Sequence, residues 1–241
     1  MLNRLLFVLV CFALATGLLA QNAVTLGAPK RANLGKILLV GDSITMGAGS
    51  PGGYRAILEQ RLQSEGHYFE FVGGSTENSF SMEQPKHEGH GGWSTLDILN
   101  GKPDQPAKGK IVDWVTKYKP NFVLIMTGTN DDIWVTKQEW LAKYYALLKA
   151  VYTASPKVKV VLATIPKSNN GVTGKSWGEA VCYDVVRKEA VVFKSRGFKM
   201  AFVDTYTTFN PATDLADDYH PNAKGYQKIA NAFYGGLMKL K

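Results

Sequence analysis

The chain has 241 residues, of which 45% are hydrophobic and 20% are charged, and its formal net charge is +8. This composition excludes a disordered chain, and two cysteines, Cys11 and Cys182, are too few for a disulfide scaffold. The basic residues are spread along the sequence and are not interleaved with aromatic residues, which argues against nucleic-acid binding. We expect them to form a solvated surface with a mild attraction for acidic polymers.

Residues 1–20 are typical of a secretory signal peptide. Arg4 gives a short basic start, an apolar stretch follows, and small residues precede Gln21. The apolar stretch is shorter than the roughly 20 residues of a membrane-spanning helix, and no stop-transfer segment follows it. An uncleaved membrane anchor is the alternative. We therefore expect a secreted protein, extracellular or periplasmic, in which residues 21–241 form a single domain without stable membrane association.

The remaining sequence alternates strand-like and helix-like patterns. Short apolar runs predict strands at residues 36–40, 69–72, 122–126, 158–165 and 199–203. Apolar residues spaced three and four apart predict helices that follow Gly53, contain Trp114, contain Tyr144, contain Cys182 and follow Pro221. This alternation predicts a parallel sheet with helices on both faces. Residues 73–107 form a long polar and glycine-rich connection, and a connection of that length inside a domain is usually functional.

The tripeptide Gly41-Asp42-Ser43 directly follows the first predicted strand. Ligands of open parallel sheets bind at the carboxyl edge of the strands, so this turn places the Ser43 hydroxyl where a substrate would bind. A small polar turn after a strand is also ordinary loop chemistry. The tripeptide therefore indicates a nucleophile only together with other residues that would serve a serine hydrolase.

A serine hydroxyl needs a base, which is usually a histidine held by a carboxylate. Of the four histidines, only His220 has an aspartate, Asp217, three residues earlier in a loop next to a helix start. This spacing allows the carboxylate to reach the imidazole. The alternative is that Asp217 caps the last helix.

Asn130 follows the predicted strand at 122–126 and therefore lies at the same carboxyl edge as Ser43. Its side-chain amide is suited to donate a hydrogen bond to an oxyanion. The stretch Gly128-Thr129-Asn130-Asp131 is also compatible with an ordinary turn, because these are common turn residues.

Taken together, these stretches resemble the sequence blocks of the SGNH (GDSL-type) hydrolases. The blocks are Gly41-Asp42-Ser43-Ile44, a glycine in the long connection, Gly128-Thr129-Asn130-Asp131 and Asp217-x-x-His220-Pro221, in the family's order. The resemblance implies a three-layer α/β/α sandwich with a five-stranded parallel sheet, similar to flavodoxin. The nucleophile comes first and not in the middle of the chain, which agrees with a fold other than that of the α/β-hydrolases.

Carried over by matching positions, the resemblance implies Ser43 as nucleophile, His220 as base and Asp217 as the carboxylate partner of the base. It also implies an oxyanion hole made of the backbone N–H groups of Ser43 and Gly92 and the side chain of Asn130. Gly92 is chosen because Gly92-Trp93-Ser94 resembles the family's second block, and Gly91 and Gly74 are the alternatives.

The segment from Glu88 to Trp93 resembles a subset of this superfamily, the acetyl-xylan esterases of carbohydrate esterase family three. The resemblance implies secretion and removal of acetyl groups from xylan. Trp93 and Trp134 lie near the expected site and are candidate stacking surfaces for sugar rings, although a core or wall position is equally compatible with each. His87 and His90 with Glu88 supply too few well-spaced ligands for a zinc site.

We therefore expect a serine esterase without cofactor or metal that releases acetyl groups from xylan or a related polysaccharide through an acyl-enzyme intermediate. The 73–107 connection has few aliphatic residues, which favours a small polar mouth for short acyl chains. The alternatives are a lysophospholipase- or thioesterase-type enzyme of the same superfamily, a catalytically silent carbohydrate-binding protein, and a flavodoxin-like binding protein. The last is disfavoured because no phosphate-binding glycine motif follows the first strand. We expect a monomer whose partner is an acetylated polysaccharide or another small ester, and no nucleic acid.

Overall fold

The computed structural model describes residues 31–80, 82–132, 134–169 and 176–241. The expected signal peptide at residues 1–20 lies outside the described residues. The strands are β1 (Asn33–Gly41), β2 (Tyr68–Val72), β3 (Glu88–Gly89), β4 (Phe122–Met126), β5 (Lys159–Ala163) and β6 (Met200–Val203). The helices are α1 (Ser43–Met46), α2 (Gly53–Ser64), α3 (Thr95–Asn100), η1 (Pro106–Lys108), α4 (Ile111–Tyr118), α5 (Lys137–Ala154), α7 (Ser176–Ser195), α8 (Pro211–Asp214) and α9 (Ala223–Leu240).

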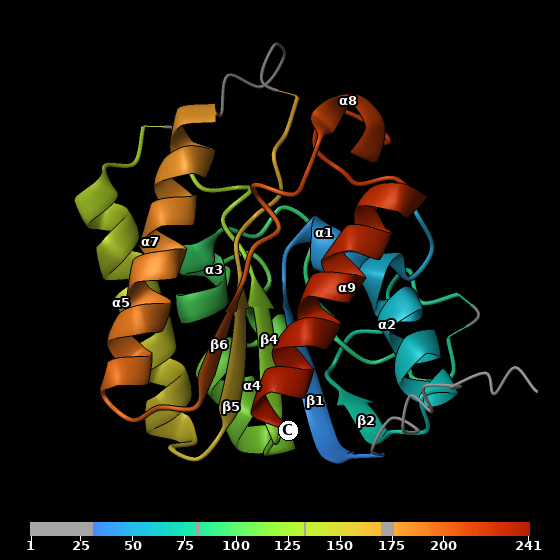
Figure 1. Ribbon diagram of the computed structural model, residues 1–241. Coiled ribbons are helices and arrows are strands. Elements are labelled where there is room, and N and C mark those ends of the chain that lie inside the picture. The colour runs from blue at the N-terminus through green and yellow to red at the C-terminus, as the bar shows by residue number, and fades with distance from the viewer. Residues whose placement is uncertain (1–30, 81, 133, 170–175) are drawn as a thin grey trace, which may run out of the picture. The chain divides into compact units, whose positions relative to one another are not determined.

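The central sheet is parallel, with the strand order β2-β1-β4-β5-β6, and the two-residue strand β3 also pairs with β1. Helices α2 and α9 pack together on one face, and α3, α4, α5 and α7 cover the other (Figure 1). This is the strand order of flavodoxin-like sheets, so the predicted three-layer α/β/α sandwich is confirmed. The five predicted strands are all present, and β3 is a short addition to them.

The central strands consist of continuous apolar residues because helices cover both faces of the sheet. Every residue of β4 is buried, and in β5 only Lys159 is partly exposed. The described helices that flank the sheet include none long and apolar enough to cross a membrane. The site must therefore lie in the loops at the strand ends, because the body of the sheet is filled by packed side chains.

The long connection at 73–107 is more ordered than its polar sequence suggests. It contains β3, α3 and η1, and α3 begins with a capping box in which Ser94 and Asp97 bond to each other's backbone N–H groups. At β3 the backbone lies so close to α1 that a Cβ atom on Gly89 would meet Met46 N at 2.5 Å. Glycine is therefore required there.

A fully buried guanidinium holds the short helix α1 in place. Arg55 Nε donates to Thr45 O at 2.7 Å, Nη2 donates to Met46 O at 2.8 Å, and Nη1 donates to Ser79 Oγ at 2.9 Å. Burial lowers the pKa of Arg55 to about 10. Arg55 thus joins the end of α1 to the segment near Ser79. Its burial could not be predicted from the sequence, because arginine is mostly exposed and one arginine in an amphipathic helix gives no sign of burial.

Candidate active site

Ser43 is the first residue of α1 and directly follows β1. The Asp42 side chain caps this helix by accepting the N–H of Ile44 at 2.9 Å. Chain order reverses between β1 and β4, and such a switch point opens a crevice at the carboxyl edge of a parallel sheet. Ser43 follows one of these two strands and Asn130 follows the other, so both flank the crevice at the top of the view in Figure 1.

The structure brings Ser43, His220 and Asp217 together in one hydrogen-bonded row. His220 Nε2 lies 2.9 Å from Ser43 Oγ, and His220 Nδ1 lies 2.8 Å from Asp217 Oδ2. When Nδ1 carries the proton and donates it to Asp217, Nε2 is left as an acceptor for the serine hydroxyl. The row can therefore take a proton from Ser43 and stabilise the charge that forms on the imidazole.

Asp217 is kept ionised by the loop that carries it. Partial burial raises its pKa, but its Oδ1 atom accepts the N–H groups of His220 at 2.7 Å and Tyr219 at 2.8 Å, and the His220 ring contacts it as well. The net effect lowers the pKa of Asp217 below its ordinary value. Its side chain is 54% exposed, against 25% for His220, so water reaches the carboxylate.

Asn130 is oriented by the segment that precedes α3. Its Nδ2 atom donates to the carbonyl of Trp93 at 3.0 Å. The next residue, Asp131, accepts from the N–H of Thr95 at 2.9 Å and from its hydroxyl at 2.8 Å, and it pairs with Lys143. An amide NH2 group has two N–H bonds, and among the described residues only Trp93 accepts from this one. A second donor therefore remains for a ligand.

The three candidate glycines for the oxyanion hole differ in what their N–H groups do. The N–H of Gly74 donates to Glu88 Oε1 at 2.5 Å, so it is already engaged. Gly91 and Gly92 are exposed, and no described residue accepts from their N–H groups. Gly92 has a φ of +74° and nothing within 4 Å of the place of a Cβ atom. The geometry therefore disfavours Gly74 and leaves Gly92 and its neighbour available.

Trp93 does not present a stacking surface, and that expectation is wrong. Its side chain is fully buried, and its Nε1 donates to Gln105 Oε1 at 3.1 Å. Its ring packs against the rings of His90 and Trp114, with centroid distances of 4.4 and 6.1 Å. Trp134, by contrast, is 81% exposed in the loop between β4 and α5. Of the two tryptophans, only Trp134 remains a candidate for sugar binding.

The polar side chains next to Trp93 are turned inward as well. Glu88 and His90 are each 2% exposed, and Glu88 Oε2 lies 2.9 Å from His90 Nε2. The His90 ring packs against the rings of Trp93 and Trp114. This buried pair fixes the shape of the glycine loop that follows it. The described residues contain no group of three or more His, Cys, Asp or Glu side chains that could hold a metal ion.

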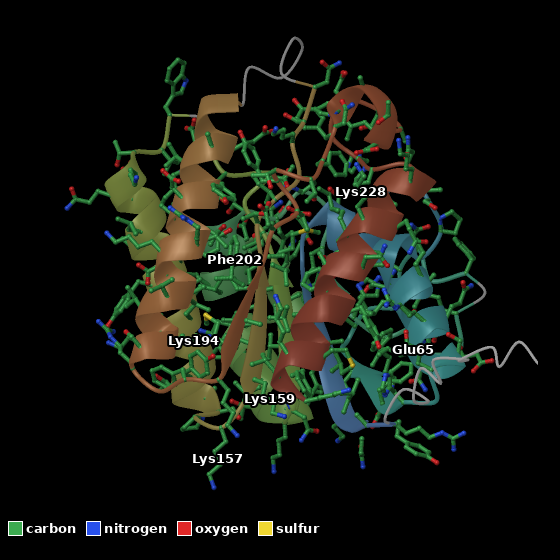
Figure 2. The ribbon with its side chains drawn as sticks, in the orientation of Figure 1. Glu65, Lys157, Lys159, Lys194, Phe202 and Lys228 are labelled. Carbon is green, nitrogen blue, oxygen red and sulfur yellow. The ribbon has the colours of Figure 1, made fainter. Side chains whose placement is uncertain are left out.

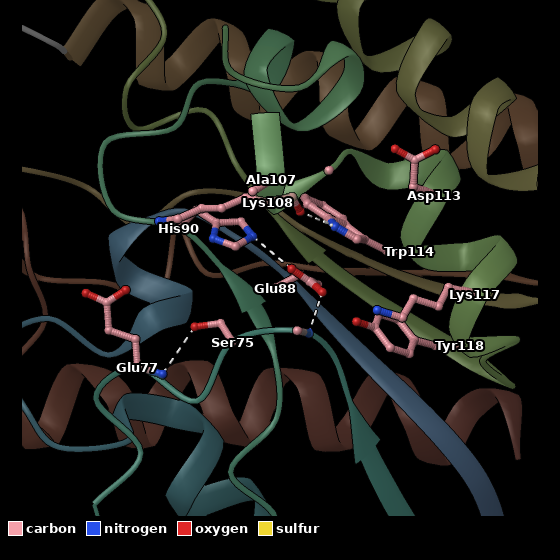
Figure 3. Close-up of a pocket in the computed structure, with 12 residues that line it drawn as sticks. Ser75, Glu77, Glu88, His90, Ala107, Lys108, Asp113, Trp114, Lys117 and Tyr118 are labelled. Carbon is pink, nitrogen blue, oxygen red and sulfur yellow. Dashed lines mark hydrogen bonds and ion pairs between the residues drawn. The ribbon is translucent and has the colours of Figure 1, made fainter. Parts of the chain in front are cut away.

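A cavity of about 450 Å³ lies beside this pair, and it is not the place where the predicted catalytic residues meet (Figure 3). Glu88, His90, Trp114 and Tyr118 are among its lining residues, whereas Ser43, Asp217 and His220 are not. The dashed lines in Figure 3 join the lining residues to one another. The hydrogen-bonded row of Ser43 therefore opens on the loops at the strand ends and not into this cavity.

Burial also acts on the carboxyl group beside Ser43. Asp42 is 1% exposed, and burial raises its pKa to about 6, although the N–H of Ile44 and interactions with Thr129 act in the opposite direction. Because the folded-state pKa lies above the ordinary value of 3.8, ionisation destabilises the fold. The fold therefore has the full stability associated with the neutral carboxyl below pH 3.8, and this contribution is lost as the pH rises through about 6.

Asp42→Asn should therefore raise the free energy of unfolding by about 1–3 kcal/mol at pH 8 and leave it nearly unchanged at pH 3.5. Asparagine retains the oxygen that caps α1 but never ionises. Urea unfolding of both proteins at the two pH values measures the difference. An equal gain at both pH values would mean that the ionisation of Asp42 is not its source.

The sequence matches the GDSL-like lipase/acylhydrolase family over residues 39–228. It is 31% identical over 213 residues to a multidomain esterase of Ruminococcus flavefaciens, which covers 80% of this chain but only 27% of that protein's length. Among solved structures, the fold is similar to a family 3 carbohydrate esterase of Clostridium thermocellum, with a TM-score of 0.68 and 26% identity over 87% of this chain and 96% of that one.

A carbohydrate esterase family 3 structure from Talaromyces cellulolyticus is similar to the same degree, with a TM-score of 0.67 and 27% identity over 85% of this chain and 97% of that one. The resemblance to SGNH hydrolases and to carbohydrate esterase family three is thus confirmed. The match covers the end of β1, the whole of β4 and the loop that carries His220. The chain belongs to the GDSL-like lipase/acylhydrolase family, a family of carboxylic ester hydrolases.

Proposed function

We propose that the protein is a secreted serine esterase that removes acetyl groups from a polysaccharide, xylan or a related polymer. The observation that carries the catalytic part is the row Ser43–His220–Asp217, with distances of 2.9 and 2.8 Å. A serine placed at the carboxyl edge of the sheet, hydrogen-bonded to a histidine that a carboxylate orients, has the arrangement of an activated nucleophile.

In the proposed mechanism, Ser43 Oγ attacks the ester carbonyl while His220 Nε2 takes its proton. The tetrahedral oxyanion accepts hydrogen bonds from the N–H groups of Ser43 and Gly92 and from Asn130 Nδ2. When this intermediate collapses, His220 gives the proton to the leaving alcohol and the acyl group stays on Ser43. His220 then takes a proton from water, which attacks the acyl-enzyme carbonyl. When this second tetrahedral intermediate collapses, the bond to Ser43 Oγ breaks, His220 returns the proton to Ser43 Oγ, and the acid is released.

The acetyl preference rests on three observations. The similar solved structures include family 3 carbohydrate esterases, and one more distant structure is an acetyl xylan esterase of Geobacillus stearothermophilus. Around the glycine loop, residues 73–95 contain no Leu, Ile or Val that could line a channel for a long acyl chain. Trp134 is exposed near the end of β4, where an aromatic face can stack on a sugar ring. Secretion rests on the pattern of residues 1–20 alone.

The test is a series of p-nitrophenyl esters from acetate to decanoate, run beside acetylated xylan. We expect kcat/KM to be greatest for acetate, acetate to be released from xylan, and the Ser43→Ala variant to do neither. A rate that rises with chain length, with no acetate released from xylan, would replace this proposal with the lipolytic alternative. Binding to xylan without any hydrolysis would make the protein a silent carbohydrate-binding member of the family.

A further inference from the structure

Nine positively charged side chains gather at the end of the molecule opposite to Ser43. They lie in the last turns of helices α4, α7 and α9, or in the segments that follow α4, α5, α7 and α9 and lead into the strands. The nine residues, named here the basic end, are Lys117, Lys119, Lys157, Lys159, Lys194, Arg196, Lys199, Lys239 and Lys241. All are exposed except Lys159, which is partly exposed. Figure 2 shows Lys157 and Lys159 at the lower end of the sheet, with Lys194 on the lower part of α7.

Backbone hydrogen bonds place these segments side by side. The N–H of Lys159 donates to the carbonyl of Asn121 at 3.0 Å, and the N–H of Val160 donates to the carbonyl of Lys199 at 2.9 Å. The segments that lead into β4, β5 and β6 therefore lie next to one another. Burial and the charge of Lys199 together lower the pKa of Lys159, which agrees with the closeness of the two ammonium groups.

The basic end contains no acidic residue. The stretches 117–121, 155–159, 194–200 and 239–241 have neither aspartate nor glutamate. Acidic side chains lie at its margin: Glu70 on β2 pairs in register with Lys36 on β1, and Glu189 on α7 lies close enough to Arg196 for the two charges to interact. The nine charges of the basic end exceed the net charge of +8 of the whole chain. The rest of the molecule is therefore close to neutral, and the charge is strongly asymmetric.

The helix dipole accounts for part of this distribution. Lys117, Lys194 and Lys239 occupy last turns of helices, where cations are favoured by a few tenths of a kcal/mol. It does not account for Lys157, which lies beyond the end of α5, or for Lys199, which leads into β6. Repulsion among so many cations lowers the stability of the folded protein unless a bound polyanion compensates it. This uneven distribution of charge therefore indicates a binding surface.

We propose that the basic end binds an anionic polysaccharide, a glycan that carries carboxylate groups, and that this holds the enzyme on its substrate. The proposal rests on the proposed function, which makes the substrate a polysaccharide. Eight of the nine cations are lysines, which act as point charges and suit spaced carboxylates, whereas phosphate and base recognition favours arginine. Lys194, Lys199 and Lys239 line a hollow of about 420 Å³ together with Phe198, a place for one sugar unit between charges.

Nucleic acid is a poorer partner for this surface. Single strands bind where exposed aromatic rings alternate with the cations. Among the described residues, the cations of the basic end contact one exposed ring, that of Tyr145 beside Arg196. The other rings that they contact, Tyr118, Phe122 and Phe193, are partly exposed or buried, so no series of exposed rings is present there. Because the basic end and Ser43 lie at opposite ends of the strands, a polymer bound there leaves the catalytic edge free. Anchoring and ester cleavage can therefore proceed on the same polymer network.

The test compares two variants with the same loss of charge. In the first, Lys119, Lys157, Lys199 and Lys239 of the basic end are changed to Gln. In the matched control, the exposed residues Lys86, Lys108, Lys137 and Lys188, which lie elsewhere, are changed to Gln. Binding to polygalacturonate, to neutral dextran and to double-stranded DNA is measured at about 50 mM and about 500 mM NaCl, between which electrostatic screening increases strongly. Hydrolysis of p-nitrophenyl acetate is measured for all three proteins.

We expect the wild type to bind polygalacturonate at low salt, to release it at high salt, and to leave dextran unbound. The variant of the basic end should bind at least about tenfold more weakly, the control should bind like the wild type, and ester hydrolysis should be equal in all three. Equal weakening of both variants would show that net charge alone acts and would overturn the proposal. Tighter binding to DNA than to polygalacturonate would refute the assignment of an anionic polysaccharide as the partner. Absence of hydrolysis in the wild type would refute the proposed function while leaving the binding result valid.

Discussion

His220→Ala is expected to lower kcat for p-nitrophenyl acetate by about 10⁴- to 10⁶-fold, the loss that follows when a serine hydrolase is deprived of its nucleophile or base. In this protein, His220 Nε2 is 2.9 Å from Ser43 Oγ, and the imidazole is the only described side-chain base within hydrogen-bond distance of that hydroxyl. Without it, the hydroxyl keeps its proton at neutral pH and attacks slowly. Steady-state kinetics of the purified variant measures the effect.

Asp217→Ala belongs to the same experiment, and its loss of kcat should be about 10- to 100-fold smaller than that of His220→Ala. The Asp217 side chain is 54% exposed, so water can take its place at His220 Nδ1 and retain part of the ring's orientation. Thermal unfolding serves as the control, because both residues lie in a solvated loop and neither variant should lose the fold. Full activity in His220→Ala would refute the proposed triad, and a greater loss in Asp217→Ala than in His220→Ala would contradict the roles assigned here.

Asn130→Ala is expected to lower kcat by about 10²- to 10³-fold and to change KM little. A single donor to the oxyanion contributes that much, and it contributes mainly as negative charge develops in the transition state. Asn130→Asp keeps the shape of the side chain but replaces the donor by an anion, so its loss should be at least as large. Kinetics of both variants at one pH provides the comparison.

Asn130 also donates to the carbonyl of Trp93, so the two roles have to be separated. Loss of that bond alone would loosen the glycine loop and would appear as lower thermal stability in both variants. A large rise in KM at constant kcat would instead make Asn130 a residue that binds the ground state. The rise in KM at constant kcat would remove it from the proposed oxyanion hole, whereas the loss of stability would report only the bond to Trp93.

The strands that carry the site could be predicted because their chemistry is local. β1 and β4 are runs of apolar residues followed by polar turns, and Ser43 and Asn130 lie two and four residues beyond the ends of these strands. The rule that ligands bind at the carboxyl edge then joins two positions that are 87 residues apart. His220 could be paired with Asp217 for a similar reason, since a separation of three residues permits contact within one loop.

The sequence could not predict which way a side chain points or which distant segments lie next to each other in the fold. The sequence made Trp93 a candidate for stacking on a sugar ring, but its side chain is buried in the core and packs against Trp114. β3 has only two residues and no periodicity, so no pattern could reveal it. The Ser94–Asp97 spacing did carry the signal of a helix start, and a search for capping boxes would have found α3. The lysines of the basic end looked dispersed because parallel strands bring distant segments to one end.

The two ends of the proposed proton path, Ser43 and His220, are separated by 177 positions along the chain. The first strand and α1 are synthesised early, whereas the histidine follows almost all other elements and precedes only α9. A nascent chain therefore carries Ser43 long before it carries the base of the proposed mechanism. On that mechanism, the chain gains catalytic competence only after its C-terminal segment has been made and has folded against the rest.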